Sequence, residues 1–254
     1  MILNSIEQGS GQPIILLHGL FGAAKNLGVL ARGLSACARV ISLDLRNHGD
    51  SPHSAEMTYP AMAHDVAETI AALGIHSAML VGHSMGGKTA MHVALNHPDL
   101  ISKLAVLDIA PVTYQHGYDA FAAAMQQLSL SPSLTRAVAD ATLAENIPDP
   151  SYRAFLLNNL ILGDAPRWRV ALNEIRAAMP EMLKWQDPPD TAAFPNPALF
   201  LHGGKSDYVR PSAHEKIAAL FPDARIETIE NAAHWLHAEQ PQAVVAALQA
   251  FFFP

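Results

Sequence analysis

The chain has 254 residues, half of them hydrophobic, and a formal net charge of −7. A chain of this length can bury a large core without disulfides or metal ions. The acidic balance and the scattered lysines and arginines argue against a nucleic acid as partner, because no cationic stripe is present to neutralise phosphates. Cys37 is the only cysteine, which excludes an intrachain disulfide, and its apolar neighbours predict that it is buried.

The sequence contains no run that approaches the roughly 20 apolar residues needed for a membrane-spanning helix. Residues 1–11 lack the basic and apolar regions of a signal peptide. We therefore expect a cytoplasmic protein with no membrane span. The sequence does not predict its oligomeric state.

Short apolar runs alternate along the chain with helical patterns, as in parallel sheets that are covered on both faces. Five of these runs are typical of buried parallel strands: residues 14–17, 39–43, 78–81, 103–109 and 198–201. Residues 225–229 alternate between polar and apolar side chains and predict a strand nearer the edge of the sheet.

Three helical patterns accompany these strands. The first covers residues 59–73, where apolar side chains recur every three or four positions and Gly74 follows as a stop signal. The second covers residues 84–97 and ends before Pro98. The third runs from residue 241 to about residue 251, with Val244, Val245 and Leu248 predicted to face inward.

Residues 111–195 interrupt the alternation. The segment is poor in glycine and rich in proline, and its apolar residues repeat with a helical period, as at Phe121, Met125 and Leu128. We interpret it as a helical cap inserted over the carboxyl end of the sheet, because no flexible linker flanks it as expected for an independent domain. The predicted fold class is α/β, with a core formed by residues 1–110 and 196–254.

The motif Gly-His-Ser-Met-Gly at residues 82–86 carries the sharpest chemical signal. It directly follows one predicted strand and precedes one predicted helix, which is the setting of a nucleophile elbow. Such a turn holds its central residue in a strained backbone conformation with the side chain exposed. Glycine is needed at positions 82 and 86, because larger side chains would collide with neighbouring backbone. We predict Ser84 as the nucleophile.

A serine hydroxyl becomes a good nucleophile only when a base removes its proton, so a histidine must lie within hydrogen-bond distance. In chains with this elbow the histidine comes last, on a loop after the final strand. Residues 230–241 supply two candidates, His234 and His237. We predict His234 as the base, since it follows the last predicted strand at loop distance.

Two aspartates are candidates for the acid that orients this histidine. Asp207 follows the strand at residues 198–201, where such an acid usually stands, and Asp108 ends the strand at residues 103–109. Each also has an ordinary structural explanation, Asp207 as a turn former and Asp108 as a brace for its loop. The residues alone leave both candidates open.

Two backbone N–H groups are needed to bind the oxyanion of an acyl-transfer intermediate. Met85 directly follows the nucleophile, and Leu20 stands in the motif His-Gly-Leu-Phe-Gly after the first strand. We predict these two residues as the donors. Phe21 and Trp235 are predicted to line the substrate cleft, with ordinary core packing as the alternative.

Neither a metal nor a cofactor is predicted. His234 and His237 have a spacing at which two histidines can chelate a metal, but no clear third ligand lies nearby. The chain also lacks the motif of a zinc protease and the glycine-rich loop of a nucleotide-binding enzyme.

Taken together, these segments resemble the bacterial YbfF-type esterases of the α/β-hydrolase superfamily, from about residue 13 to residue 241. The resemblance is densest in these motifs: residues 18–22, 26–31, 44–52, 82–88, 108–111 and 232–235. It implies a core sheet with a small helical cap, and hydrolysis of short acyl esters, with acyl-CoA thioesters as a further candidate class. It also implies Ser84 as nucleophile and His234 as base, and favours Asp108 as the acid, while Asp207 stands in the superfamily's more usual place.

The expected reaction is two-step acyl transfer from a small-molecule ester or thioester to water through an acyl-enzyme. The same scaffold also supports carbon–carbon bond hydrolases and lyases, which the predicted triad does not exclude. A non-catalytic ligand-binding protein on a retained hydrolase fold is a further alternative. Labelling of Ser84 by a fluorophosphonate and a comparison of ester with diketone substrates would separate these three.

Overall fold

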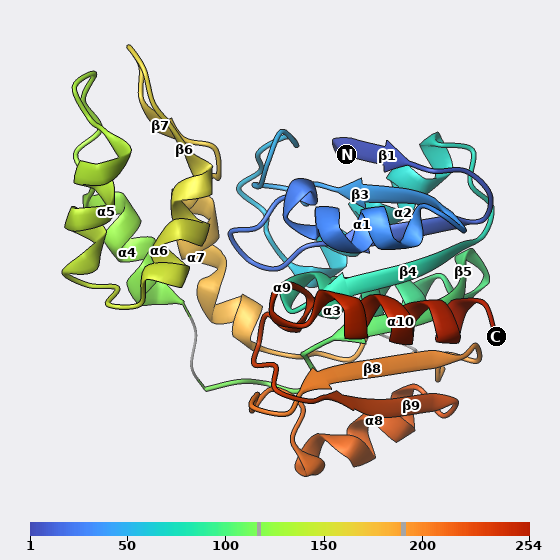
Figure 1. Ribbon diagram of the computed structural model, residues 1–254. Helices are drawn as coiled ribbons and strands as arrows, with labels where there is room; N and C mark the ends of the chain where they lie inside the picture. The colour runs from blue at the N-terminus through green and yellow to red at the C-terminus, as the bar shows by residue number, and fades with distance from the viewer. Residues whose placement is uncertain (116–117, 189–191) are drawn as a thin grey trace.

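The computed structural model describes residues 1–115, 118–188 and 192–254. Its centre is a seven-stranded sheet with the strand order β1-β3-β2-β4-β5-β8-β9 (Figure 1). All neighbouring strands in it are parallel except β1 and β3, which are antiparallel. The α/β fold class predicted from the sequence is confirmed.

The strands of the sheet coincide closely with the apolar runs. Their bounds are β1 Ser5–Gln8, β2 Pro13–Leu17, β3 Arg39–Leu43, β4 Ala78–His83, β5 Ile101–Leu107, β8 Ala198–Gly203 and β9 Ala224–Ile229. The central strands β2 to β5 are almost wholly buried, whereas β9 alternates as an edge strand does. The sequence analysis missed β1, which has polar residues on both sides of Ile6 and is mostly exposed.

Helices cover both faces of this sheet. One face packs against α1 (Gly28–Leu34) and α10 (Pro241–Phe252), and the other against α2 (Tyr59–Ala72), α3 (Met85–Asn96) and α8 (His214–Leu220). The remaining short helical segments of this part are η1 Ala24–Leu27, η2 Pro98–Leu100, η4 Pro211–Ala213 and α9 Leu236–Glu239. The sheet thus buries apolar side chains on both sides, which supplies most of the stabilising burial.

The predicted helices are present with nearly the expected ends. Gly74, with φ of 69°, follows α2 as the predicted stop. On α10, Val244 and Leu248 are fully buried and Val245 is partly buried against the same cluster. The prediction for Cys37 is wrong: this side chain is exposed, because the turn after α1 points it away from the core.

The chain between β5 and β8 forms a separate group of elements: α4 Asp119–Gln127, α5 Arg136–Ala144, α6 Pro150–Leu156, η3 Leu157–Asn159, β6 Leu160–Ile161, β7 Arg167–Trp168 and α7 Leu172–Leu183. Figure 1 shows this group beside the carboxyl ends of the parallel strands. The sequence analysis did not foresee the two-residue strands β6 and β7. In open parallel sheets ligands bind at this edge, so the group stands where it can cover a site.

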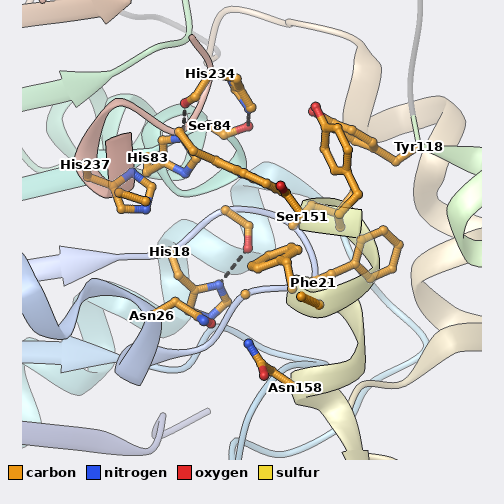
Figure 2. A pocket seen from close by; sticks show the side chains of 18 of the residues that line it. His18, Phe21, Asn26, His83, Ser84, Tyr118, Ser151, Asn158, His234 and His237 are labelled. Atoms are coloured by element: carbon orange, nitrogen blue, oxygen red, sulfur yellow. Dashed lines mark hydrogen bonds between the residues drawn. The ribbon is translucent and has the colours of Figure 1, made fainter. Parts of the chain in front are cut away.

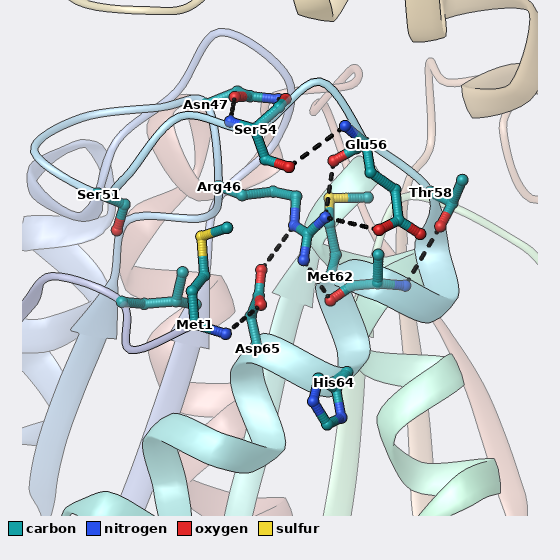
Figure 3. A network of polar contacts seen from close by, with 12 residues as sticks. Met1, Arg46, Asn47, Ser51, Ser54, Glu56, Thr58, Met62, His64 and Asp65 are labelled. Atoms are coloured by element: carbon teal, nitrogen blue, oxygen red, sulfur yellow. Dashed lines mark hydrogen bonds and ion pairs between the residues drawn. The ribbon is translucent and has the colours of Figure 1, made fainter.

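The long loop between β3 and α2 is held by a buried arginine (Figure 3). Arg46 forms an ion pair with Asp65 of α2 at 2.6 Å and donates to the carbonyls of Glu56 at 2.6 Å and Ala61 at 3.0 Å. A buried guanidinium needs such partners to offset its desolvation. The loop that carries His48 toward the carboxyl edge of the sheet is therefore fixed in place.

Candidate active site

Ser84 sits at the sharp turn between β4 and α3. Its backbone has φ of 52° and ψ of −118°, a strained conformation for a residue with a side chain. A Cβ added at Gly82 would lie 2.2 Å from the Gly86 carbonyl oxygen, and one added at Gly86 would lie 2.5 Å from the Leu17 carbonyl oxygen. Both glycines are therefore required by the turn, as the motif predicts, and the turn presents Ser84 at the carboxyl edge of the sheet.

Ser84, His234 and Asp108 are linked by hydrogen bonds from three separate loops. The distance from Ser84 Oγ to His234 Nε2 is 3.0 Å (Figure 2). The distance from His234 Nδ1 to Asp108 Oδ2 is 2.7 Å. Since a carboxylate only accepts hydrogen bonds, Nδ1 carries the proton and donates it to Asp108. This leaves Nε2 as an acceptor for the Ser84 hydroxyl, which is the arrangement a general base requires.

The two candidate acids lie in very different surroundings. Asp108 is fully buried, and besides His234 it accepts hydrogen bonds from the Gly203 N–H at 2.9 Å and from the Ser206 hydroxyl. The Asp207 side chain is 80% exposed and pairs with Arg210 at 3.3 Å. The structure thus brings Asp108 to His234 and leaves Asp207 at the surface, because β5 lies next to β8 and ends directly beneath the histidine loop.

His83 supports the loop that carries His234. Its Nε2–H donates to the backbone carbonyl of His234 at 2.8 Å, and the two rings lie 4.9 Å apart. Burial, together with the positive charge that His237 and His234 can carry, keeps the pKa of His83 well below its ordinary value. A neutral His83 can therefore hold this carbonyl without adding charge beside His234. His237, the other histidine candidate, packs its ring against His83 at 4.4 Å.

Two further buried histidines shape the loop after β2. His18 accepts a hydrogen bond from the Leu45 N–H at 3.0 Å and donates to the Gly19 carbonyl at 2.8 Å. His48 accepts from the Phe21 N–H at 3.1 Å. Burial lowers the pKa of His18, and it lowers the pKa of His48 to about 3. Both rings are therefore neutral, and their fixed tautomers hold the loop that places Leu20 beside Ser84.

Comparisons with known proteins identify the family of this chain. The family model for the alpha/beta hydrolase fold matches residues 12–241. The chain belongs to the α/β-hydrolase family. Esterase YbfF of Escherichia coli (strain K12) is 40% identical over 246 residues, 96% of this chain and 94% of that protein. The sn-1-specific diacylglycerol lipase ABHD11 of Mus musculus is 40% identical over 247 residues, 94% of this chain and 80% of that protein.

A solved structure extends the likeness to three dimensions. A marine microorganism esterase superposes with a TM-score of 0.95 at 36% sequence identity, covering 98% of this chain and 99% of that one. The resemblance to YbfF-type esterases inferred from the motifs is thereby confirmed at the level of the family. It covers the group of elements between β5 and β8 as well as the core.

A cavity of about 390 Å³ opens beside Ser84 in this α/β-hydrolase. Phe21 and Trp235, the two residues predicted to line a cleft, both line it, and Figure 2 shows Phe21 with other lining side chains around the space. The Trp235 ring packs 4.6 Å from Tyr152 and 5.1 Å from Phe155, both on α6. The cavity is therefore enclosed from both the core and the group between β5 and β8, with mostly apolar walls.

The motif analysis missed several side chains that touch the site. The Tyr208 ring stacks on the His234 ring at 4.1 Å, and its hydroxyl lies 3.2 Å from that of Tyr118. Ser206 was overlooked beside Asp207, although a hydroxyl after a strand end is a plausible partner for a buried acid. Asn159 of η3 donates to the Phe21 carbonyl at 2.7 Å. These contacts join residues that lie far apart in the sequence, so no local pattern could reveal them.

Within residues 1–115, 118–188 and 192–254, no group of three histidine, cysteine or acidic side chains is placed to hold a metal ion. No helix in the same ranges has both the length and the apolar character needed to cross a membrane.

Proposed function

We propose that this protein is a serine carboxylesterase that hydrolyses acyl esters, and the corresponding thioesters, through an acyl-enzyme on Ser84. The observation that carries the proposal is the pair of hydrogen bonds that connects Ser84 Oγ to His234 and His234 to Asp108, at 3.0 and 2.7 Å. An esterase and a lipase, each 40% identical to this chain, support the same reaction class.

In the first half of the reaction, Ser84 Oγ attacks the acyl carbonyl carbon while His234 Nε2 takes the hydroxyl proton. Asp108 stabilises the imidazolium that forms. The N–H groups of Leu20 and Met85 bind the oxyanion, since Met85 begins α3 and the first N–H groups of a helix have no partner within the helix. His234 then gives its proton to the leaving alcohol or thiol, and the bond between that group and the acyl carbon breaks.

The second half repeats the sequence with water. His234 removes a proton from a water molecule, the resulting hydroxide attacks the acyl carbon, and the same two N–H groups hold the second oxyanion. The proton returns from His234 to Ser84 Oγ as the carboxylic acid leaves. Every proton therefore passes through Nε2, so the tautomer set by Asp108 matters in both halves.

The apolar walls of the 390 Å³ cavity favour a hydrophobic small-molecule substrate. The curated relatives are an esterase and a diacylglycerol lipase by name. An ester of a bulky alcohol is a hydrophobic small molecule of the kind that this cavity favours. A thioester undergoes the same steps with a better leaving group. A cytoplasmic location is part of the same proposal, and cell fractionation tests it.

Steady-state hydrolysis of p-nitrophenyl acetate tests the proposal, with the matching acetyl thioester as a second substrate. We expect Ser84→Ala to lower kcat by at least about 10⁴-fold while the circular dichroism spectrum is unchanged. Ser102→Ala is the control, because Ser102 is exposed and lies near the start of β5, at the opposite end of the strand from Asp108. Full activity in Ser84→Ala would contradict the proposal.

A further inference from the structure

A second, smaller cavity of about 50 Å³ also reaches Ser84. Its wall includes Leu20, Ser84 and Met85 at the nucleophile, and Met179, Met182 and Lys88 farther from it. His234 lines the large cavity but is not among the residues that line the small one. The nucleophile therefore has two spaces beside it, of which only one contains the base.

Given the proposed function, this difference between the cavities assigns the leaving group to one of them and the acyl chain to the other. His234 must reach the leaving atom to protonate it, so the leaving group lies in the large cavity. The acyl chain extends from the carbonyl carbon in another direction, and the small cavity, lined by Leu20 and Met85, is the space available to it. A volume of about 50 Å³ holds about four water-sized groups. The acyl group that fits has roughly two to four carbon atoms.

The wall of this small cavity is held by a buried lysine. Lys88 lies one turn after Ser84 on α3 and is 1% exposed. Its Nζ donates to the backbone carbonyls of Leu183 at 3.0 Å and Lys184 at 2.8 Å, at the end of α7. The last carbonyls of a helix have no partner within the helix, and a cation is favourable there. Lys88 therefore joins the helix of the nucleophile to the end of α7.

A second donor acts beside the first. The Tyr59 hydroxyl donates to the Met182 carbonyl at 2.8 Å, and the Lys88 ammonium lies 5.4 Å from the Tyr59 ring. Helix α7 contains Pro180, which cannot donate a hydrogen bond inside the helix. Its end is thus stabilised from outside, and the methionines that it presents to the cavity are side chains that repack easily.

Burying this lysine is costly, and burial lowers its pKa to about 7. We propose that Lys88 is a specificity-determining positioning residue: by holding the carbonyls of Leu183 and Lys184 it fixes the end of α7 as a wall of the small cavity, and so limits the length of the acyl group. Without these two hydrogen bonds, the end of α7 keeps the Tyr59 hydroxyl on the Met182 carbonyl and the Tyr114 N–H on the Leu183 carbonyl, but it loses its link to α3. The end of α7 can then shift outward and Met182 can repack, which lengthens the cavity.

The test compares acyl chain lengths in Lys88→Met, which keeps the volume of the side chain and removes its donors. The substrates are p-nitrophenyl acetate, butyrate and octanoate, and the readouts are kcat and KM for each. We expect the wild type to prefer butyrate over octanoate by about 100-fold in kcat/KM, and the variant to reduce this preference by about tenfold or more. A second variant, Met182→Ala, enlarges the cavity without touching Lys88 and should shift the preference in the same direction.

Lys103 supplies a matched control within the chain. Its Nζ donates to the carbonyls of Phe251 at 2.9 Å and Phe252 at 3.1 Å, at the end of α10, and it lies 5.5 Å from the Phe251 ring. Lys103→Met therefore removes the same kind of contact far from Ser84. It is expected to lower the melting temperature and leave the acyl preference unchanged.

The outcomes separate this inference from the function on which it rests. If wild type and Lys88→Met hydrolyse esters with the same acyl preference, or if Lys103→Met alters it as much, the role of Lys88 is overturned and the esterase assignment stands. If Lys88→Met does not fold, the test depends on Met182→Ala. An unchanged acyl preference in Met182→Ala then overturns the role of Lys88 and leaves the esterase assignment intact. If the folded wild type hydrolyses no ester and a fluorophosphonate does not label Ser84, the proposed function fails and this inference fails with it.

Discussion

Replacing Asp108 by asparagine perturbs the orientation of the histidine with almost no change of shape. In the wild type, Asp108 Oδ1 accepts from the Gly203 N–H at 2.9 Å. Its Oδ2 accepts from His234 Nδ1 at 2.7 Å and from the Ser206 hydroxyl. An amide of the same size accepts at only one of these two positions, because its nitrogen is a donor.

The substitution therefore forces the wrong tautomer on the base. If the amide oxygen keeps the bond to the backbone, the NH₂ group faces His234, which must then accept at Nδ1 and carry its proton on Nε2. An Nε2–H cannot take the proton of Ser84. We expect kcat to fall by on the order of 10³- to 10⁴-fold, which corresponds to about 4 to 5.5 kcal/mol on the activation barrier.

Hydrolysis of p-nitrophenyl acetate at saturating substrate measures this loss, with circular dichroism as a check of folding. Asp207→Asn is the control, because it makes the same chemical change on a side chain that is 80% exposed. We expect its effect on kcat to stay within about twofold, because an exposed ion pair contributes little even to stability. If Asp108→Asn loses less than about tenfold, or if Asp207→Asn loses as much, the assignment of the acid is refuted.

Two further predictions concern the stability of the fold. Gly82→Ala places a Cβ 2.2 Å from the Gly86 carbonyl oxygen, so the free energy of unfolding in urea should fall by about 3 kcal/mol or more. Gly28→Ala, whose nearest neighbour is 3.5 Å away, should change it by less than about 1 kcal/mol, and equal losses would speak against the strained elbow. Burial lowers the pKa of His48 to about 3 and that of His237 to about 4, so below about pH 6.5 the folded protein binds fewer protons than the unfolded chain. The contribution of these two histidines to the free energy of unfolding should be fully present above that pH and decrease as the pH falls toward about 4. The urea midpoint measures this change, and a midpoint that stays constant over this range would contradict the prediction.

The central part of the fold could be predicted from the sequence because each buried strand is a continuous apolar run. The edge strand β1 could not, since its one apolar residue, Ile6, is exposed and the strand is held by its pairing with β3 rather than by burial of its own side chains. The strands β6 and β7 are two residues long and carry no pattern. The hydrophobic pattern therefore predicts elements whose own side chains are buried, and it misses elements that are held by hydrogen bonds to a neighbouring strand.

The candidate site divides in the same way. Ser84 stands in a local motif, and the chain order that accompanies this motif predicts His234 as its partner. Asp108 and Asp207 both follow strand ends, so the local sequence does not distinguish them as partners of His234. The distinction depends on how β5 and β8 lie side by side in the sheet, which is a tertiary feature. Lys88 lies within a helical pattern where a charged residue is expected to face solvent, so its burial against α7 has no counterpart in the sequence.

The central claim is that Ser84 Oγ is the atom that receives the acyl group. Treating the folded protein with a fluorophosphonate and mapping the adduct by peptide mass spectrometry tests this directly, because the probe forms a stable bond only with an activated serine. We predict one adduct, on the peptide that contains Ser84, which is absent in Ser84→Ala and forms far more slowly in His234→Ala. An adduct on a different residue, or none while the protein hydrolyses esters, would contradict it.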